Sequence, residues 1–177
     1  MKAMLKKTLS NAALVSSGIA DLSVVALGVA LMAQFVFKIA PCPLCLAQRV
    51  PYVITALLGI AGYILARKGK PKKTSLLVFI CAFVFLAGTG LAALHTGVEQ
   101  HWWESPVEGC KVDFGNGNAK TLLERIEATA PAKCDQIAWS DPVLHLSMAA
   151  WNLVASAMLC IGSLISSILI VRKANGL

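Results

Sequence analysis

Charged residues are scarce in this chain of 177 residues: only 14% are Asp, Glu, Lys or Arg, and only 7% are aromatic. Apolar residues make up 57%, and the mean hydropathy is +0.71. A soluble domain of this length needs more charged residues to cover its surface. The composition therefore excludes an ordinary soluble domain and predicts an integral membrane protein.

Long polar segments are also rare, and several apolar stretches reach the length of roughly 20 residues that a bilayer requires. The expected spans are 12–37, 46–66, 75–94 and 144–171. The sequence thus predicts an all-α membrane protein, a four-transmembrane-helix bundle in which residues 1–177 form a single integral membrane domain. The loops on one side of the membrane would be 38–45 and 95–143.

Acidic residues are nearly absent outside one segment. Eight of the nine acids fall in 95–143, whereas ten bases and no acid fall in the short segments 2–7, 67–73 and 172–173. Short loops rich in Lys and Arg stay in the cytoplasm. Both termini are therefore predicted to be cytoplasmic, and the other loops periplasmic, in a bacterial inner membrane. The net charge of +7 follows from this topology, so no nucleic-acid partner is expected.

Cysteine is infrequent too, but four of the six cysteines lie on the predicted periplasmic side. Cys42 and Cys45 form a C-x-x-C at the outer end of the second span, and Cys110 and Cys134 lie in the long loop, separated by 23 residues. Disulfides form and persist in such an oxidising compartment. The other two fall within apolar spans and are interpreted as small buried hydrophobic residues: Cys81 and Cys160.

The C-x-x-C spacing favours redox chemistry, because a disulfide that closes so short a loop exchanges easily. Cys45 directly precedes the helix expected from Leu46, and the positive end of a helix favours a thiolate. Arg49 lies one turn further along the same face. It could stabilise that thiolate and donate a hydrogen bond to a quinone carbonyl. An arginine near a helix end also reaches the membrane interface without any such role, and this alternative stays open.

Other interpretations of the loop cysteines also stay open. A purely structural Cys110–Cys134 disulfide would stabilise the fold by roughly 3 to 4 kcal/mol. All four outer cysteines could surround a zinc ion, but only one pair is closely spaced, so no metal is expected. A non-catalytic scaffold or small transporter with a disulfide-stapled loop would leave Arg49 dispensable. Within the long loop, the spacing of apolar residues in 119–128 predicts a short amphipathic helix.

Several motifs follow one another in a fixed order along the chain: Pro41-Cys42-Pro43-Leu44-Cys45 and Gln48-Arg49, then His95-Thr96-Gly97-Val98-Glu99-Gln100, Trp102-Trp103 and Cys110, and finally Cys134, Trp139 and Ser147-Met148-Ala149-Ala150-Trp151-Asn152. In the order and membrane placement of these motifs, nearly the whole chain resembles the bacterial disulfide-bond formation protein B (DsbB) family. The members of this family are quinone-dependent oxidants of thioredoxin-like periplasmic proteins. A quinone or epoxide reductase of the vitamin K type contains similar parts, but in the opposite order along the chain.

The resemblance implies a protein-disulfide:quinone oxidoreductase that reoxidises a periplasmic thioredoxin-fold dithiol oxidase (DsbA-like). Such an enzyme supports disulfide-bond formation in exported proteins. Its cofactor would be a quinone of the membrane pool, ubiquinone or menaquinone, and the protein is expected to be monomeric. Cys45 would face the quinone ring, Arg49 would contact the quinone, and His95 would line its pocket.

The resemblance also implies an order for the cysteines. Cys42, Cys45, Cys110 and Cys134 would be catalytic and would work as the disulfides Cys42–Cys45 and Cys110–Cys134. A reduced partner would attack Cys110, and Cys134 would exchange with Cys42. The positions of the residues alone indicate only that both pairs lie on one side of the membrane.

Overall fold

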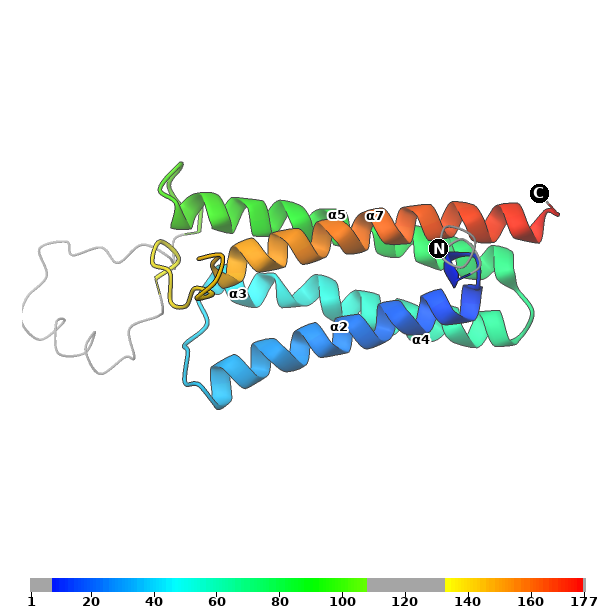
Figure 1. Ribbon diagram of the computed structural model, residues 1–177, viewed down its shortest axis with the longest axis horizontal. Helices are drawn as coiled ribbons and strands as arrows, with labels where there is room; N and C mark the ends of the chain where they lie inside the picture. The colour runs from blue at the N-terminus through cyan, green and yellow to red at the C-terminus, as the bar shows by residue number, and fades with distance from the viewer. Residues whose placement is uncertain (1–7, 108–132, 177) are drawn as a thin grey trace, which may run out of the picture.

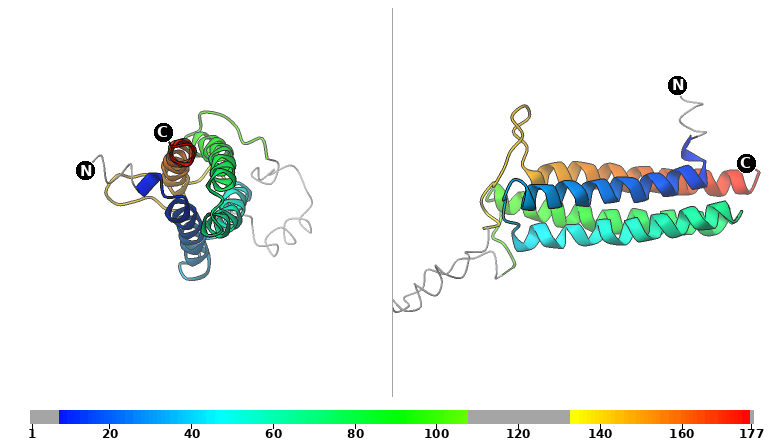
Figure 2. Two further views of the ribbon diagram at one scale, coloured as in Figure 1. Left: turned by 90° about the vertical axis from the view of Figure 1, so that its right-hand side faces the viewer. Right: turned by 90° about the horizontal axis from the view of Figure 1, so that it is seen from below.

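The computed structural model describes residues 8–107 and 133–176, and its secondary-structure elements are helices. They are α2 (Ala12–Phe35), α3 (Pro43–Ala47), α4 (Arg49–Arg67), α5 (Pro71–Glu99) and α7 (Met148–Ala174). α3 leads directly into α4, and together they form one membrane-length segment, Pro43–Arg67. The long helices lie side by side along a common axis (Figure 1 and Figure 2). The expected all-α bundle of four membrane-length helices is confirmed.

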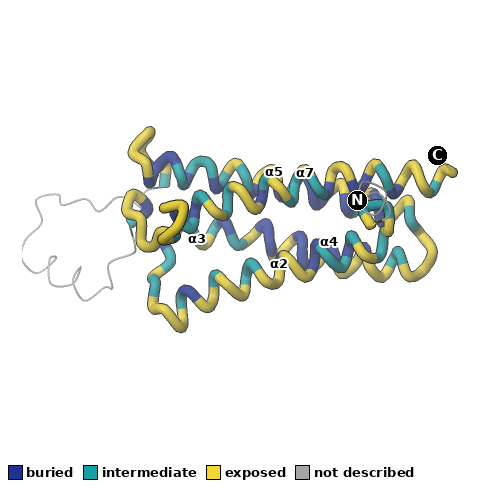
Figure 3. Tube along the Cα trace, in the orientation of Figure 1, coloured by how far each residue is buried: buried dark blue, intermediate teal, exposed yellow. Residues whose placement is uncertain are grey.

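The outside of the bundle is apolar. All four segments are long and apolar enough to cross a membrane. Many of their large apolar side chains point outward, and Leu57, Phe83 and Met158 are each more than half exposed. Figure 3 shows exposed positions recurring along every helix. Since lipid favours such a surface and water does not, the protein is a multi-pass membrane protein.

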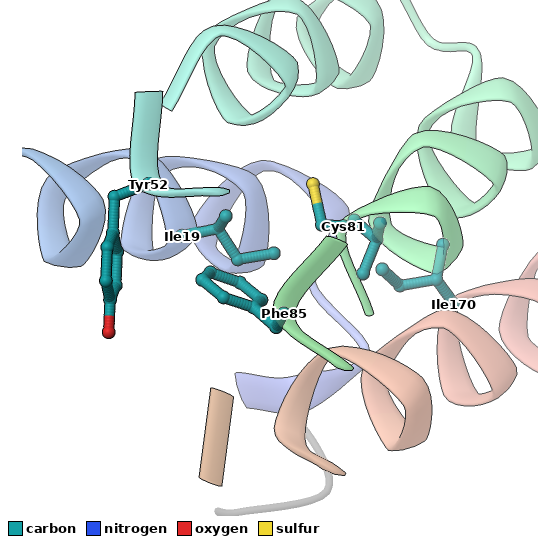
Figure 4. Close-up of a cluster of buried hydrophobic side chains, with 6 residues drawn as sticks. Ile19, Tyr52, Cys81, Phe85 and Ile170 are labelled. Carbon is teal, nitrogen blue, oxygen red and sulfur yellow. The ribbon is translucent and has the colours of Figure 1, made fainter. Parts of the chain in front are cut away.

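A buried cluster holds the middle of the bundle together. It contains Ile19, Tyr52, Val78, Cys81, Phe85 and Ile170, drawn from all four long helices (Figure 4). The rings of Tyr52 and Phe85 meet edge to face with their centroids 6.1 Å apart. α2 and α4 approach closely at Gly59, where an added Cβ would lie only 2.8 Å from the backbone nitrogen of Ala20. Glycine is therefore required at this crossing.

The helix ends differ from the expected spans because capping residues, and not hydropathy, set them. The second segment begins at Pro43 and the third at Pro71, since proline fits the first position of a helix. α5 continues beyond position 94 to Glu99. The last helix begins at Met148, after the Ser147 hydroxyl oxygen accepts a hydrogen bond from the backbone N–H of Ala150 at 3.1 Å.

The bundle has two different ends. α2 begins and α7 ends at one of them, where α4 also turns into α5 (Figure 1). The opposite end carries α3, the end of α5 and the beginning of α7, and we call it the α3 end. The expected amphipathic helix at 119–128 lies outside the described residues.

Candidate redox site

Cys42 is the N-cap residue of α3. Its backbone is extended (φ −77°, ψ 166°), and Pro43 follows at the first helical position. The Cys42 sulfur accepts a hydrogen bond from the backbone N–H of Cys45 at 3.3 Å. The sequence instead predicts that Cys45 lies at the helix N-terminus, with a helix that starts at Leu46. The structure differs because Pro43 starts the helix earlier, so the free N–H groups meet Cys42.

Cys42 and Cys45 are free thiols whose Sγ atoms are hydrogen-bonded at 3.1 Å. A disulfide holds its sulfurs at about 2.05 Å, so this is the reduced form of the pair, and the Cys42–Cys45 disulfide stays a prediction. The hydrogen bond with Cys45 lowers the pKa of Cys42 from 9.0 to about 4, against the opposing effect of burial and with a smaller contribution from His95. The backbone N–H of Cys45 and Nε2 of His95 also face this sulfur, so the surroundings favour a thiolate at Cys42.

His95, in the last turn of α5, faces the Cys42 sulfur. Its side chain is only 3% exposed, and its Nε2 lies 3.5 Å from Cys42 Sγ. Its Nδ1 accepts a hydrogen bond from Gln48 Nε2 at 2.8 Å. Because Nδ1 is the acceptor, the ring hydrogen sits on Nε2. An isolated histidine at a membrane interface would be solvated, whereas this one is enclosed. Its expected place in a quinone pocket stays a prediction.

A chain of side-chain hydrogen bonds continues from Gln48 into the bundle. Gln48 Oε1 accepts from Asn152 Nδ2 at 2.5 Å, and Asn152 Oδ1 accepts from the Tyr52 hydroxyl at 2.5 Å. The chain therefore joins α4 to α7 and orients the imidazole from behind. Satisfied buried networks of this kind hold their members in fixed orientations. The sequence analysis quotes Asn152 only as part of a motif and gives neither Asn152 nor Tyr52 a role, since no local pattern connects residues so far apart.

Glu99 is a buried acid one helical turn after His95. It is 9% exposed, and its Oε1 lies 3.7 Å from His95 Nε2. The hydroxyl of Ser147 donates to its other oxygen, Oε2. Since Ser147 is also the N-cap of α7, this contact ties the start of α7 to the end of α5. The i, i+4 spacing of His95 and Glu99 was the sequence signal for this contact. Exposed pairs on helix surfaces have the same spacing, so the spacing alone does not indicate a buried pair.

Arg49 lies at the start of α4, one turn beyond Cys45. Its side chain is half-buried, and its Nη1 donates to Gln34 Oε1 of α2 at 2.8 Å. A guanidinium group has further N–H donors for another acceptor, such as a quinone carbonyl oxygen. Cys45 is also only half-buried, in contrast to Cys42. These residues therefore fit a quinone head group on the Cys45 side of the dithiol.

Cys134 lies at the same end of the bundle. It is 0% exposed and belongs to a buried cluster with Cys42, Leu44 and Val98. Cys134 is disulfide-bonded, and Cys110 lies outside the described residues. A zinc site needs thiolates, which a disulfide does not supply, so the alternative of zinc held by all four outer cysteines does not apply to this structure.

A smaller set of possible metal ligands lies at the dithiol itself. The two sulfurs of the dithiol and Nε2 of His95 lie within 4.8 Å of one another. Their mutual hydrogen bonds account for this proximity, and we assign no metal to them. Cys81 and Cys160 are free thiols, and Cys81 is part of the core of the bundle, as its apolar surroundings in the sequence predict.

The family model described as Disulfide bond formation protein DsbB matches residues 13–166, from α2 into α7. This chain belongs to the DsbB family. The family assignment makes it an oxidoreductase that acts in disulfide-bond formation, and the expected family is confirmed.

Curated relatives named Disulfide bond formation protein B align with most of the chain. Disulfide bond formation protein B 1 of Pseudomonas fluorescens (strain Pf0-1) is 31% identical over 145 residues, which are 76% of this chain and 77% of the relative. Disulfide bond formation protein B of Hahella chejuensis is 31% identical over 73% of this chain and 77% of its own length. The protein of that name from Dechloromonas aromatica is 30% identical over 79% of this chain and 81% of its own. No solved structure matches the chain significantly.

Proposed function

We propose that the protein is a protein-dithiol:quinone oxidoreductase of the bacterial inner membrane. It reoxidises a periplasmic dithiol oxidase of thioredoxin fold (DsbA-like) and passes the electrons to ubiquinone or menaquinone. The observation that carries this proposal is the burial of Cys134, a disulfide sulfur, in one cluster with Cys42 of the reactive dithiol. Thiol–disulfide exchange needs an attacking thiolate close to a disulfide sulfur, and a shared buried cluster keeps one sulfur of each pair in the same small region.

The burial of Cys134 also supports a direction for the first exchange. Because Cys134 is 0% exposed, a partner thiolate reaches this disulfide through its other sulfur, which we assign to Cys110. The partner forms a mixed disulfide with Cys110, and Cys134 is released as a thiolate. The second thiol of the partner then attacks its own mixed disulfide. The partner leaves oxidised, and Cys110 becomes a thiolate.

The second exchange moves the electron pair to the C-x-x-C. The Cys134 thiolate attacks Cys42 in the oxidised Cys42–Cys45 pair, and Cys45 is released. Cys110 next attacks Cys134, restores the loop disulfide and releases Cys42. A thiol of low pKa is a good leaving group, and the pKa of about 4 suits Cys42 to this last step.

The reduced pair is then reoxidised at the Cys45 side. Cys45 and Arg49 would hold the quinone head group, with the remaining guanidinium donors directed to a carbonyl oxygen. When bound, the quinone supplies the two-electron oxidation that restores the Cys42–Cys45 disulfide. The contact between Arg49 and Gln34 fixes the guanidinium between α4 and α2, which prepares it for this role.

The charge distribution supports an orientation in which the α3 end is periplasmic. The basic segments 67–73 and 172–173 lie at the opposite end of the bundle (Figure 1). Short basic segments stay in the cytoplasm. This orientation places both termini in the cytoplasm and the cysteine pairs where disulfides persist.

The function is tested with purified protein, a reduced thioredoxin-fold dithiol protein and a soluble quinone analogue, by following quinone absorbance. The wild-type chain is expected to reduce quinone as the partner is oxidised. Cys134→Ser should lose turnover and, when given oxidised partner, trap it as a mixed disulfide on Cys110. Cys160→Ser in α7 is the matched control and should turn over normally. An adduct on Cys42 or Cys45 would overturn this electron path, and turnover in Cys134→Ser would make the loop disulfide a structural staple.

A further inference from the structure

Three groups that exchange protons lie close together at the α3 end: the Cys42 thiol, the His95 imidazole and the Glu99 carboxyl group. His95 Nε2 lies 3.5 Å from Cys42 Sγ and 3.7 Å from Glu99 Oε1. Cys42 and His95 are 3% exposed, and Glu99 is 9% exposed. The single N–H at His95 Nε2 therefore faces two groups that can each become an anion, and it donates a hydrogen bond to one of them at a time.

The surroundings of Glu99 favour one negative charge and not two. In the described part of the chain, the titratable groups that face Glu99 are Cys42 and Cys45 at the start of α3 and His95 on its own helix. α7 contributes the neutral hydroxyl of Ser147. A buried charge is costly without a partner, and a second like charge nearby adds to the cost. A thiolate at Cys42 and a carboxylate at Glu99 therefore disfavour each other.

The neighbouring hydrogen bonds prepare an exchange between these two anions. The bond from Gln48 to Nδ1 keeps the ring hydrogen of His95 on Nε2, where both anions can accept it. Ser147 accepts from the backbone N–H of Ala150, so its own hydrogen is free to bind Glu99 Oε2. Oε1 is then the carboxyl oxygen that either carries a proton or accepts from His95.

We propose that Glu99 is the proton partner of the Cys42–Cys45 dithiol: it holds a proton while Cys42 is a thiolate and gives that proton up when the disulfide forms. The proposal rests on the redox function proposed above. In the dithiol state the N–H of His95 donates to the Cys42 sulfur, and after oxidation it donates to the carboxylate of Glu99. The site keeps one buried negative charge, which moves from sulfur to carboxylate.

The atoms and electrons balance in this scheme. The reduced site holds a Cys42 thiolate, a Cys45 thiol and a Glu99 carboxylic acid. Formation of the Cys42–Cys45 bond releases two electrons, the proton of Cys45 and the proton of Glu99. A bound quinone, which is a two-electron and two-proton acceptor, would take up both electrons and both protons. Without Glu99 the same oxidation releases a single proton, and the second one has to come from bulk water.

Proton counting tests the proposal on the dithiol alone. The background chain has no other cysteine because it carries four substitutions: Cys81→Ser, Cys110→Ser, Cys134→Ser and Cys160→Ser. The reduced protein is oxidised in detergent at neutral pH with ferricyanide, which accepts electrons but no protons, and a pH-indicator dye counts the protons. We expect two protons per disulfide in the background chain and one after Glu99→Gln. Thiolate absorbance in each sample shows that Cys42 is ionised before oxidation.

Asp135→Asn is the matched control, since it converts an exposed carboxyl group next to Cys134 into an amide. It should leave the count at two protons. A count of two in Glu99→Gln, or of one in the background chain, would overturn the proposal. So would a Cys42 thiol that is not ionised in the reduced background chain, because both protons would then come from the cysteines.

Infrared difference spectroscopy provides a second readout that needs no substitution at Glu99. In the background chain labelled with ¹³C-glutamate, the dithiol state should show the C=O band of a protonated glutamic acid, and the disulfide state should replace it with carboxylate bands. Exposed glutamates are ionised at neutral pH, so an acid band is assigned to Glu99. Its absence in the dithiol state would overturn the proposal. Loss of partner-to-quinone turnover in the full chain would reject the proposed function, whereas normal turnover with an unchanged proton count would reject only the role of Glu99.

Discussion

The α3 end and the rest of the bundle satisfy their polar groups in different ways. Away from the α3 end, the Ser23 hydroxyl lies 2.7 Å from the carbonyl oxygen of Ile19 in its own helix and 2.9 Å from the Thr55 hydroxyl of α4, so its contact across helices is a single pair of hydroxyls. Ser167 donates to the carbonyl of Leu164 at 2.8 Å. At the α3 end, amide and ring side chains instead form a continuous network across helices, in which Gln48 bonds to both His95 and Asn152. A group bonded within its own helix can be replaced cheaply, whereas each member of a cross-helix network depends on the others.

Two buried cysteines show what this difference means for chemistry. Cys81 and Cys42 are 1% and 3% exposed, so burial does not distinguish them. Cys81 packs among apolar side chains such as Ile19 and Phe85. Cys42 is surrounded by hydrogen-bond donors from Cys45 and His95, which stabilise its thiolate. Reactivity therefore follows from the local donors, and not from depth in the protein.

The largest expected effect separates these two cysteines. Cys42→Ser should abolish turnover with partner and quinone, because a serine hydroxyl cannot form or exchange a disulfide. Cys81→Ser should keep turnover near the wild-type rate, since its new hydroxyl can bond to a carbonyl one turn back in α5. Quinone reduction by the reduced partner measures both. If Cys42→Ser still turned over, the α3 end would not be the redox centre.

A smaller effect is expected from Arg49→Ala. Removal of a charged hydrogen-bond donor costs about 1.5 to 3 kcal/mol, which corresponds to a KM for quinone raised roughly 10- to 100-fold. The first exchange with the partner should be unchanged, as Cys110 and Cys134 belong to another segment. Arg67→Ala, at the other end of α4, is the control. Equal quinone dependence in both variants would make Arg49 an interface anchor only.

The next prediction concerns the pH dependence of Cys42. Its pKa of about 4 means that alkylation of Cys42 should stay near its maximal rate until the pH falls towards that value. The thiolate therefore stabilises the fold above the ordinary thiol pKa, and this contribution is lost as the pH falls through about 4. His95→Leu removes one donor and should raise the midpoint by about 1 unit.

The control for this pH profile is His101→Asn, which removes an exposed imidazole at a backbone position with φ 57° that asparagine tolerates. Its alkylation midpoint should match that of the unmodified chain. A midpoint near the ordinary thiol value in the unmodified chain would show that the donors around Cys42 do not hold a thiolate.

The smallest expected effect compares the stability of the two regions directly. Asn152→Leu leaves Gln48 and Tyr52 without their partner and should lower the free energy of unfolding by about 2 kcal/mol. Ser167→Ala removes a single hydroxyl bonded within its own helix and should cost about 0.5 to 1 kcal/mol. Denaturant unfolding in detergent measures both changes. Equal losses would mean that the network at the α3 end is no more interdependent than the rest of the bundle.

The bundle itself could be predicted because membrane spans are local features. An apolar run of sufficient length predicts a span wherever it packs, and all four runs became long helices. Their ends were less predictable. Pro43 and Ser147 set them by capping, which hydropathy does not measure, and the shift at Pro43 moved the N-cap from Cys45 to Cys42.

The sequence by itself determined the membrane character, the C-x-x-C, the place of Arg49 one turn beyond it and the family, since each depends on composition or short spacing. Only the tertiary structure decided which groups surround the dithiol. Cys42 meets His95 across 53 positions of sequence, and Glu99 meets Ser147 across 48. Such contacts arise when α3, α5 and α7 pack together, and packing depends on all the helices at once. Spacing along one helix cannot specify them.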